Sequence, residues 1–328
     1  MWESSVYPFK KVSLYFHRMA AVRVFCTVLQ SWLLENLCIW VPAILSLACV
    51  TPPPVDATFL DIWFFFLQTG FIIVEGNFLC QHVLLNTVYR DAPSLSVRCS
   101  DAPVVQQGVF DFFTTMVPAQ FIASAGFSFI SFMLLPRESV EATLRLTAEH
   151  GYMARPLPFL LRLLIVRVTV DIWFYIVHWL LHRKGVYEAI HITHHEHIKP
   201  TLWTNYHFSV LDLIFEGFVP FGIALAVLES IGLSSPLIET NALLAHIMHY
   251  EIGSHSGTTA PLVSFFPPLS CAYKLFLGDI DRENVLFHHC HHVYRLCNYG
   301  ITQWVDIILG TKKQNVDMTR HLYRPKSK

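Results

Sequence analysis

Histidines that stand close together are the residues of this chain with the clearest chemical potential. The sequence has 18 histidines, and six of them lie between positions 178 and 197. Four more lie between positions 288 and 292. Because even placement would put about one histidine in a 20-residue window, both segments are strongly enriched in imidazole.

The spacing of these histidines places their side chains on single faces of helices. His178 and His182 form an H-x-x-x-H pair, one helical turn apart. Two H-x-x-H-H motifs follow, and positions i, i+3 and i+4 of a helix also share a face. The members of the two motifs are His191, His194 and His195, and then His288, His291 and His292.

A third region adds His246, His249 and His255, so that eight or nine imidazoles could meet at one point. Imidazole suits iron, zinc, copper and nickel, and one metal ion cannot use that many nitrogen ligands. The pattern therefore predicts two metal ions with four or five ligands each.

Metal-bound histidines usually donate their second ring N–H to a carboxylate or carbonyl. Asp171 lies seven residues before His178 on the same helical face and is the expected acceptor. Glu188 and Glu196 are alternatives. Asp171 could instead form a structural ion pair with Arg167, four residues earlier.

Four histidines stand alone in the sequence and are excluded from the predicted site. They are His17, His82, His150 and His321. An isolated histidine near a membrane is more often an interfacial or hydrogen-bonded residue than a metal ligand.

Composition indicates a membrane protein. Hydrophobic residues make up 53% of the 328 positions and charged residues only 14%, against about a quarter in soluble domains. The net charge of −1 gives no reason to expect a nucleic-acid partner. The eight cysteines contain no C-x-x-C pair, which predicts mostly buried, reduced thiols rather than a disulfide framework.

Crossing a bilayer takes roughly 20 apolar residues, and several stretches qualify. The expected crossings are Val24–Val50, Phe59–Leu85, Val109–Leu135, Leu157–Leu181 and Leu211–Leu233. A shorter apolar piece, Leu237–Tyr250, is expected to complete a hairpin with the fifth crossing or to lie in the interface. No cleavable signal peptide is evident.

Basic residues before the first apolar run predict a cytosolic N-terminus, and Arg183 and Lys184 then place the end of the fourth crossing in the cytosol. The expected fold class is an all-α, polytopic membrane helical bundle with a cytosol-facing helical cap that carries the histidine motifs. The loop 136–156 departs from the charge rule because it carries three arginines, although three glutamates accompany them.

Between Arg167 and Thr311 the chain resembles the fatty acid hydroxylase superfamily of sterol desaturases, sterol methyl oxidases and lipid hydroxylases. Asp171 to His182 (DIWFYIVHWLLH) is similar to the family's first histidine helix, and Tyr187 to Glu196 (YEAIHITHHE) to its second box. The His255-Ser-Gly triplet and the segment from Phe287 to Thr311 resemble the sterol subgroup.

The resemblance implies a di-iron centre that uses dioxygen to oxidise a lipid, with electrons from NAD(P)H through a reductase and commonly a b-type cytochrome such as cytochrome b5. By position it implies as iron ligands His178, His182, His191, His194, His195, His255, His288, His291 and His292, with His249 as a tenth. Supporting contacts are expected from Asp171, Glu188 and Asn298.

The implied division of the chain is into transmembrane helices in residues 1–156, a di-iron catalytic region in 157–313 and a basic cytosolic tail in 314–328. The tail ends in Arg324-Pro-Lys-Ser-Lys328, which approximates a retrieval signal of the endoplasmic reticulum. A multi-pass protein of that membrane, with its active site towards the cytosol, is therefore expected.

Three departures from the sterol subgroup leave the substrate open. Thr258–Pro261 replaces the usual tyrosine-containing segment, His289-Cys290 stands where aspartate and leucine are usual, and Phe208 replaces a proline after His207. A sterol is the favoured substrate, and the alternative is a fatty acyl or sphingolipid chain at the same metal site.

Other classes of protein also fit parts of the pattern. A membrane metal transporter would place its ligands at mid-membrane, and a bis-histidine haem protein would need only two of these histidines. A non-catalytic relative would be expected to have lost some of the core histidines, and all are present. The sequence does not separate hydroxylation, demethylation through methyl oxidation, and desaturation.

Overall fold

The computed structural model describes residues 7–54, 56–92, 137–150, 155–258, 260, 263–277 and 281–313, together with isolated positions between 113 and 125. All regular elements in these ranges are helices, which confirms the all-α class. Most of the predicted crossing Val109–Leu135, and the tail 314–328, lie outside the described residues.

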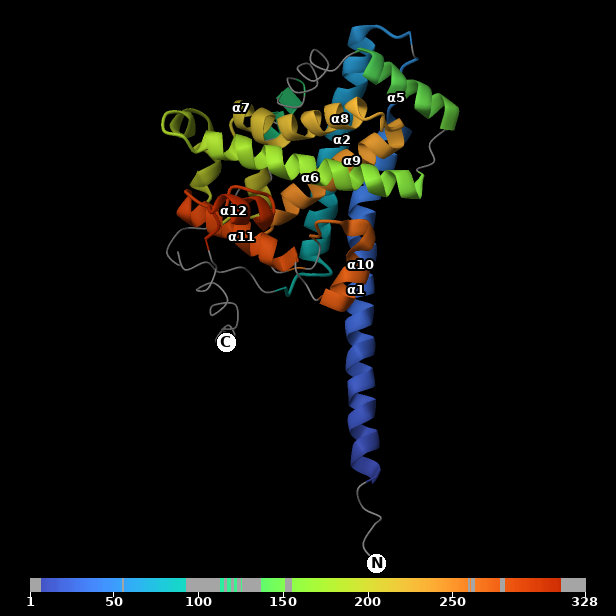
Figure 1. The fold of residues 1–328 in the computed structure, drawn as a ribbon, viewed down its shortest axis with the longest axis vertical. Coiled ribbons are helices and arrows are strands. Elements are labelled where there is room, and N and C mark those ends of the chain that lie inside the picture. Colours follow the sequence, from blue (N-terminus) through green and yellow to red (C-terminus); the bar gives the residue numbers. More distant parts are fainter. Residues whose placement is uncertain are drawn as a thin grey trace, which may run out of the picture.

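Two long helices at the N-terminal end form an antiparallel hairpin. α1 spans Tyr7–Cys49 and α2 spans Phe59–Asn86. The three consecutive prolines after Thr51 separate them, because each proline lacks a backbone donor and disfavours the helical conformation of the residue before it. Thr58 and Asp61 form a reciprocal capping box that starts α2. Figure 1 shows the two helices side by side, with α1 extending well beyond the rest of the molecule.

Three helical stretches of the described chain are long and apolar enough to cross a membrane: Val22–Cys49, Phe59–Asn86 and Val210–Ser230. Large apolar side chains on α1 and α2 point outward, such as Leu37 and Leu79 at 54% and 53% exposure. Because such surface is unfavourable in water, the protein is a membrane protein.

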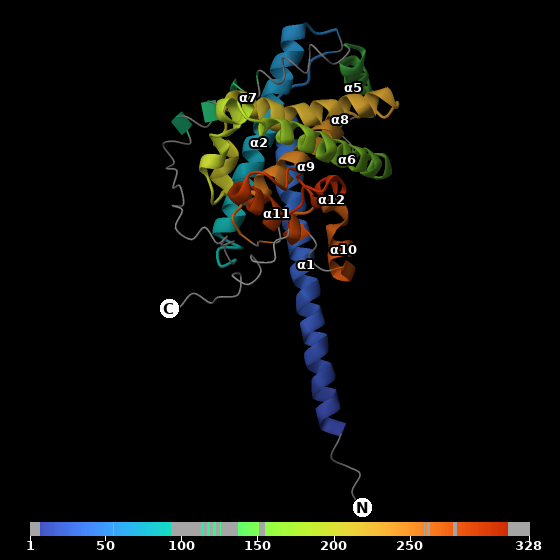
Figure 2. The same ribbon diagram turned by 60° about the vertical axis from the view of Figure 1, so that its left-hand side comes forward.

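The predicted fourth crossing is a helix, but it is not one of these three spans. α6, Pro156–Leu181, carries Arg162, Arg167 and Asp171 within its apolar sequence, and all three are buried. In Figures 1 and 2, α6 and its neighbour α8, Val219–Ser230, run across the direction of α1 and α2. The expected crossing Leu157–Leu181 is therefore not among the candidate spans of the described chain, and α6 turns its charged residues into the protein interior.

α9, Leu237–Ser254, is the central helix of the fold. All 18 of its residues are buried, and it packs against α1, α2, α6 and α11. Arg162 on α6 reaches Glu239 at its first turn, with Nη1 and Oε2 2.5 Å apart. The sequence predicted an interfacial or hairpin helix here, whereas the structure makes it the core on which the other helices pack.

The remaining elements surround this core. Before α8 the chain forms α7, Val210–Asp212, and the π-helical turn η5, Leu213–Phe218. The other elements are α5 (Arg137–His150), η2 (Tyr187–His191), η3 (His194–Glu196), η4 (Leu202–Tyr206), η6 (Pro267–Leu269), α10 (Ser270–Leu277), α11 (Asp281–Tyr294) and α12 (Gln303–Leu309).

Arg167 and Asp171 do not form the direct pair that their spacing allows. Arg167 donates from Nε to the carbonyl of Phe265 at 2.6 Å, and its guanidinium also covers the ring of Tyr250. Asp171 accepts hydrogen bonds from the backbone N–H and the hydroxyl of Thr302. Each charged group therefore ties α6 to a different part of the C-terminal half.

Candidate metal centre

Nine of the predicted ligands gather into two adjoining groups of imidazoles. The five-histidine group contains His178, His182, His191, His195 and His291. The four-histidine group contains His194, His255, His288 and His292. In each group the candidate ligand atoms all lie within 4.8 Å of one another and are buried.

Helix ends and short irregular turns supply these side chains. His178 lies in the last turn of α6 and His182 caps its C-terminus. The second motif is not on an α-helix: His191 ends the π-helical turn η2, and His194 and His195 lie in the 3-10 turn η3. Wide and then tight turns in succession redirect these rings, so His191 and His195 join one group and His194 joins the other.

The last motif is on an α-helix, and it too contributes to both groups. On α11, His288 and His292 are one turn apart and belong to the four-histidine group, whereas His291 belongs to the five-histidine group. The helix therefore lies along the boundary between the groups. Its position explains why one H-x-x-H-H motif can serve two metal ions.

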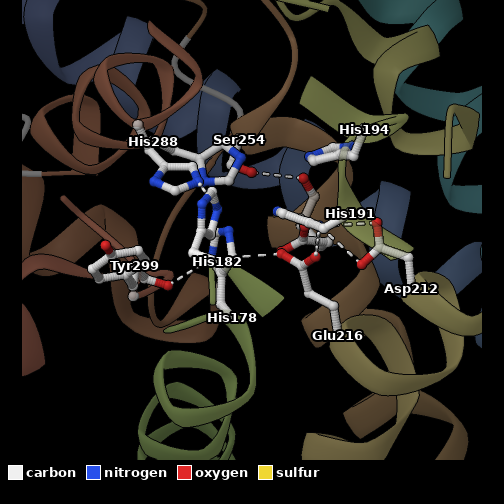
Figure 3. Close-up of polar contacts among 12 residues, drawn as sticks. His178, His182, His191, His194, Asp212, Glu216, Ser254, His288 and Tyr299 are labelled. Atoms are coloured by element: carbon white, nitrogen blue, oxygen red, sulfur yellow. Dashed lines mark hydrogen bonds and ion pairs between the residues drawn. The ribbon is translucent and has the colours of Figure 1, made fainter. Parts of the chain in front are cut away.

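Backbone carbonyls hold several rings in one orientation. The Nδ1 atoms of His178, His291 and His255 lie 2.8, 2.6 and 2.9 Å from the carbonyl oxygens of Tyr299, Cys297 and Glu251. A carbonyl oxygen can only accept, so each Nδ1 carries the proton and each Nε2 presents a lone pair. Figure 3 marks the contact between His178 and Tyr299.

The Nε2 atoms of each group converge on one another. The Nε2 of His291 lies 3.1 Å from the Nε2 atoms of both His182 and His195. In the other group the Nε2 of His255 lies 2.8 Å from that of His288. Two nitrogens bound to one ion at about 2.1 Å, a right angle apart, would be separated by about 3.0 Å. The residues therefore fit a metal ion in each group.

Further ring nitrogens lack any other partner. The Nε2 of His178 and both ring nitrogens of His292 are buried and make no hydrogen bond to any residue that the structure describes. A buried polar atom without a partner is unfavourable by about 1–3 kcal/mol. Coordination of a metal would satisfy these atoms as well.

Burial keeps the imidazoles neutral, which is the form that binds metal. Burial first, and neighbouring imidazoles to a smaller extent, lower the pKa of His291 to about 3 and that of His255 to about 4, although the hydrogen bonds to the carbonyls of Cys297 and Glu251 oppose the shift. The pKa values of His194, His288 and His292 also fall well below the usual range, because of burial first and then the adjacent histidines. At neutral pH these nitrogens are free of protons that would compete with a metal.

Two carboxylates that sequence reasoning missed support the five-histidine group. The Nδ1 of His191 lies 2.9 Å from both carboxylate oxygens of Asp212 and 3.4 Å from Oε2 of Glu216. Figure 3 shows both acids reaching His191. Glu216 also lies 3.6 Å from Nδ1 of His178. Two acidic residues four apart inside an apolar stretch were the available signal, because such residues need a structural or functional reason.

Residues 163–311 match the fatty acid hydroxylase family profile. This region is similar to the fatty acid hydroxylase superfamily. It contains all nine histidines of the two groups, so the family match and the metal geometry coincide.

Two curated proteins are similar to part of this chain. A fatty acid hydroxylase, ahd1, from Mycosarcoma maydis is 28% identical over 151 residues, 46% of this chain and 33% of the relative. Methylsterol monooxygenase 1 from Gallus gallus is 31% identical over 153 residues, 45% of this chain and 44% of the relative. The chain thus spans less than half the length of these relatives. No solved structure matches the chain.

His249, the tenth predicted ligand, lies outside both groups of the hydroxylase region. Its Nδ1 lies 3.1 Å from the side-chain nitrogen of Gln81, which also donates to the carbonyl of His249 at 3.0 Å. Its Nε2 lies 3.9 Å from a carboxylate oxygen of Glu35. The structure therefore brings His249 to α1 and α2 rather than to the candidate metal ligands.

Two of the three predicted supporting residues, Asp171 and Asn298, contact the loop whose carbonyls hold the imidazoles. Asp171 holds Thr302 in the loop that also carries Tyr299. Asn298 adopts a left-handed φ of 58°, donates to the carbonyl of Phe287 and accepts from the backbone of Lys313. It thereby shapes the turn whose carbonyls, at Cys297 and Tyr299, hold His291 and His178.

Glu188 is exposed and accepts a hydrogen bond from the backbone of Gly185, so it does not contact the groups. Glu196, the other alternative, is also exposed and pairs with Nε2 of His207 at 2.9 Å. Two more histidines are buried elsewhere: His246 is hydrogen-bonded to the carbonyl of Ala242, and His289 is absent from both groups.

Proposed function

We propose that this protein is a membrane-bound, non-haem di-iron oxidoreductase that uses dioxygen to oxidise a lipid. The observation that carries the proposal is the convergence of buried imidazoles into two groups whose Nε2 atoms lie within about 3 Å of one another. Two bound irons would supply dioxygen binding and electron transfer, which side chains alone cannot provide.

The chain's own residues would fix the metal positions and exclude water. The carbonyls of Tyr299, Cys297 and Glu251 orient three rings before any metal binds. This preorganisation reduces the loss of side-chain freedom on metal binding. Burial of eight of the nine histidines would shield the reacting centre from bulk water.

We propose a sterol as the substrate, oxidised by hydroxylation, by demethylation through methyl oxidation, or by desaturation. His255-Ser-Gly and the similarity to a methylsterol monooxygenase support this choice. The similarity to a fatty acid hydroxylase supports the alternative, a fatty acyl or sphingolipid chain at the same metal site.

The proposal extends to the organisation and setting of the chain. Residues 157–313 would form the catalytic region, 1–156 the membrane anchor and 314–328 a basic cytosolic tail. The site would face the cytosol at the endoplasmic reticulum, where NAD(P)H would supply electrons through a reductase and cytochrome b5.

Metal analysis of the purified protein tests the central claim. About two irons per chain, with no haem absorbance, are expected. A single zinc and no iron after iron-replete expression would refute the redox mechanism.

Lipid analysis of a deletion strain tests the substrate. Accumulation of methylated sterols supports the sterol assignment. Accumulation of non-hydroxylated acyl chains, with unchanged sterols, would replace it with the alternative.

A further inference from the structure

His194 turns its Nε2 towards the four-histidine group without a hydrogen bond behind its ring. Its Nδ1 is buried and has no hydrogen-bond partner among the described residues, whereas the Nδ1 of His255 in the same group lies 2.9 Å from a carbonyl oxygen. His194 also lies in a 3-10 turn of only three residues rather than on a regular helix. Because the χ2 torsion of a histidine has broad energy minima, packing must fix the orientation of this ring.

Phe208 lies face to face with the imidazole of His194. The two ring centroids are 3.9 Å apart, and the ring planes differ by 17°. This separation is van der Waals contact across the ring faces. The imidazole cannot rotate about its Cβ–Cγ bond without driving its edge into the phenyl ring. The stack therefore restricts the torsion that the missing hydrogen bond leaves free.

His207, the residue before Phe208, makes a second stack on the same turn. Its ring centroid lies 4.2 Å from that of His197, with the ring planes 7° apart, and its Nε2 lies 2.9 Å from the carboxylate of Glu196. The Nδ1 of His197 lies 2.9 Å from Oγ1 of Thr204. Two consecutive rings thus pack against two rings that are three residues apart. We call His207 and Phe208 the ring clamp.

The residue after the ring clamp is anchored as well. Ser209 donates from its hydroxyl to the carbonyl of Ile190 at 2.8 Å, and its Oγ accepts from the backbone N–H of Asp212 at 3.1 Å as the N-cap of α7. Asp212 in turn accepts a hydrogen bond from Nδ1 of His191. Phe208 therefore lies between His194 and a segment that is itself fixed by hydrogen bonds.

We infer that Phe208 is a positioning residue, whose stacked ring holds Nε2 of His194 towards the metal ion of the four-histidine group. The inference rests on the proposed function, because it requires a metal in that group. The Nε2 of His194 lies 3.3 Å from that of His255, so the stack maintains an orientation in which both nitrogens can bind one ion. Phe208 also replaces the proline of the sterol subgroup, and a proline has no aromatic ring to stack on an imidazole.

Metal affinity tests the role of the ring without any turnover. The full-length protein in nanodiscs is loaded with Co²⁺ and titrated with a chelator, and the Co²⁺ content per chain is measured. Phe208→Leu keeps an apolar side chain but removes the ring. It should lower the affinity for one Co²⁺ ion at least about tenfold, as loss of a residue that supports a ligand does, and leave the affinity for the second ion within about twofold.

Phe208→Tyr is the conservative variant because it keeps the ring. Both Co²⁺ affinities should stay within about threefold of the parent, since stacking is retained. The visible ligand-field absorption of the bound Co²⁺ should also remain that of the parent, whereas Phe208→Leu at full loading should change it. A Phe208→Tyr variant that binds Co²⁺ as weakly as Phe208→Leu would overturn the inference.

Phe66→Leu is the matched control. Phe66 is also partly buried, and it packs in an apolar cluster with Ile62 on α2, Val140 on α5 and Leu237 at the start of α9. The same substitution there should leave both Co²⁺ affinities within about twofold of the parent. Equal losses in Phe66→Leu and Phe208→Leu, or an equal loss of both ions in Phe208→Leu, would indicate a general structural disturbance and reject the positioning role.

Removal of a second ligand assigns the affected metal to its group. In a His288→Ala background the four-histidine group has already lost a ligand, and its Co²⁺ should be absent. Phe208→Leu should then cause no further loss of metal. A further loss would place the effect of Phe208 on the five-histidine group, contrary to the inference.

A metal-free measurement separates this inference from the proposed function. Thermal unfolding of the metal-free protein in detergent should give a lower melting temperature for Phe208→Leu than for the parent. The difference should be smaller in a His194→Ala background, where the stacked partner is absent. Equal differences in the two backgrounds would contradict the stack. A parent protein that binds no metal would refute the proposed function, and this double-mutant cycle would still decide whether the two rings support each other.

Discussion

The two histidine groups are held in place by different means. In the five-histidine group, two rings donate to backbone carbonyls and a third to the carboxylate of Asp212. In the four-histidine group, His255 has a carbonyl acceptor, whereas neither ring nitrogen of His292 has a hydrogen-bond partner within the described part of the chain. The difference indicates that the five-histidine group is preorganised by the fold, and that the four-histidine group depends more on its metal.

The largest effect is expected when one metal-binding histidine of either group is replaced by alanine. His291→Ala and His194→Ala should each lower the metal content from about two ions per chain to about one. Each should reduce activity by at least about a hundredfold, because changes to residues behind the ligands already lower metal affinity or activity 10–100-fold. Elemental analysis and turnover measure both, and membrane insertion should remain intact. Full activity of His194→Ala would refute the ligand assignment.

Acidification should destabilise the metal-free protein. The pKa values of His291 and His255 are about 3 and about 4 in the folded state, against about 6.5 in an unfolded chain. Between these values the unfolded chain binds protons that the folded chain does not. The free energy of unfolding therefore falls as pH decreases through 6.5 towards 4, by up to about 1.4 kcal/mol per pH unit for each group.

Thermal unfolding in detergent between pH 8 and pH 5 measures this effect. His291→Ala removes one buried imidazole and should show a shallower decline than the parent protein. A melting temperature that stays constant over this range would contradict the assigned burial of the imidazoles.

Replacing Asp212, whose carboxylate accepts the hydrogen bond from Nδ1 of His191, tests how much this side chain contributes to metal binding. Asp212→Asn should weaken metal binding in the five-histidine group about 10–100-fold, because an amide is a weaker acceptor for the ring N–H. Competition with a chelator, followed by metal analysis, measures the affinity.

Glu251→Gln is the matched control for that variant. Its backbone carbonyl is the acceptor for His255, and the carboxylate oxygen lies farther away, at 3.8 Å. Metal affinity should therefore change by less than about threefold. Equal losses in both variants would show that the two groups are not anchored differently.

The smallest expected effect comes from Asp171→Asn. The amide keeps one acceptor for the Thr302 backbone and loses the charge, so the stability of the fold should fall by about 1 kcal/mol. Denaturant unfolding checks the change. Metal stoichiometry should remain that of the parent, and loss of one metal would instead assign Asp171 a direct role in the five-histidine group.

Much of the candidate site was predictable because helical spacing and ligand chemistry are local properties. The H-x-x-x-H pair and the two H-x-x-H-H motifs contain eight of the nine grouped histidines, and the ninth, His255, belongs to the third histidine region of the sequence. The positions of Asp212 and Glu216 were not predictable in this way. They lie 21 and 25 residues after His191, in another helical segment, and only packing brings them to its Nδ1.

The sequence alone determined the all-α class, the membrane setting and the histidine motifs. These properties depend on overall composition and on the spacing of residues that are close together in the sequence. The tertiary structure decided how each motif is divided between two groups, that His249 contacts Gln81, and that α6 crosses the α1–α2 hairpin with its charges buried. These outcomes depend on contacts between distant segments. A π-helical turn, a 3-10 turn and a left-handed Asn298 direct the rings and carbonyls, and their geometry is set by the helices packed around them.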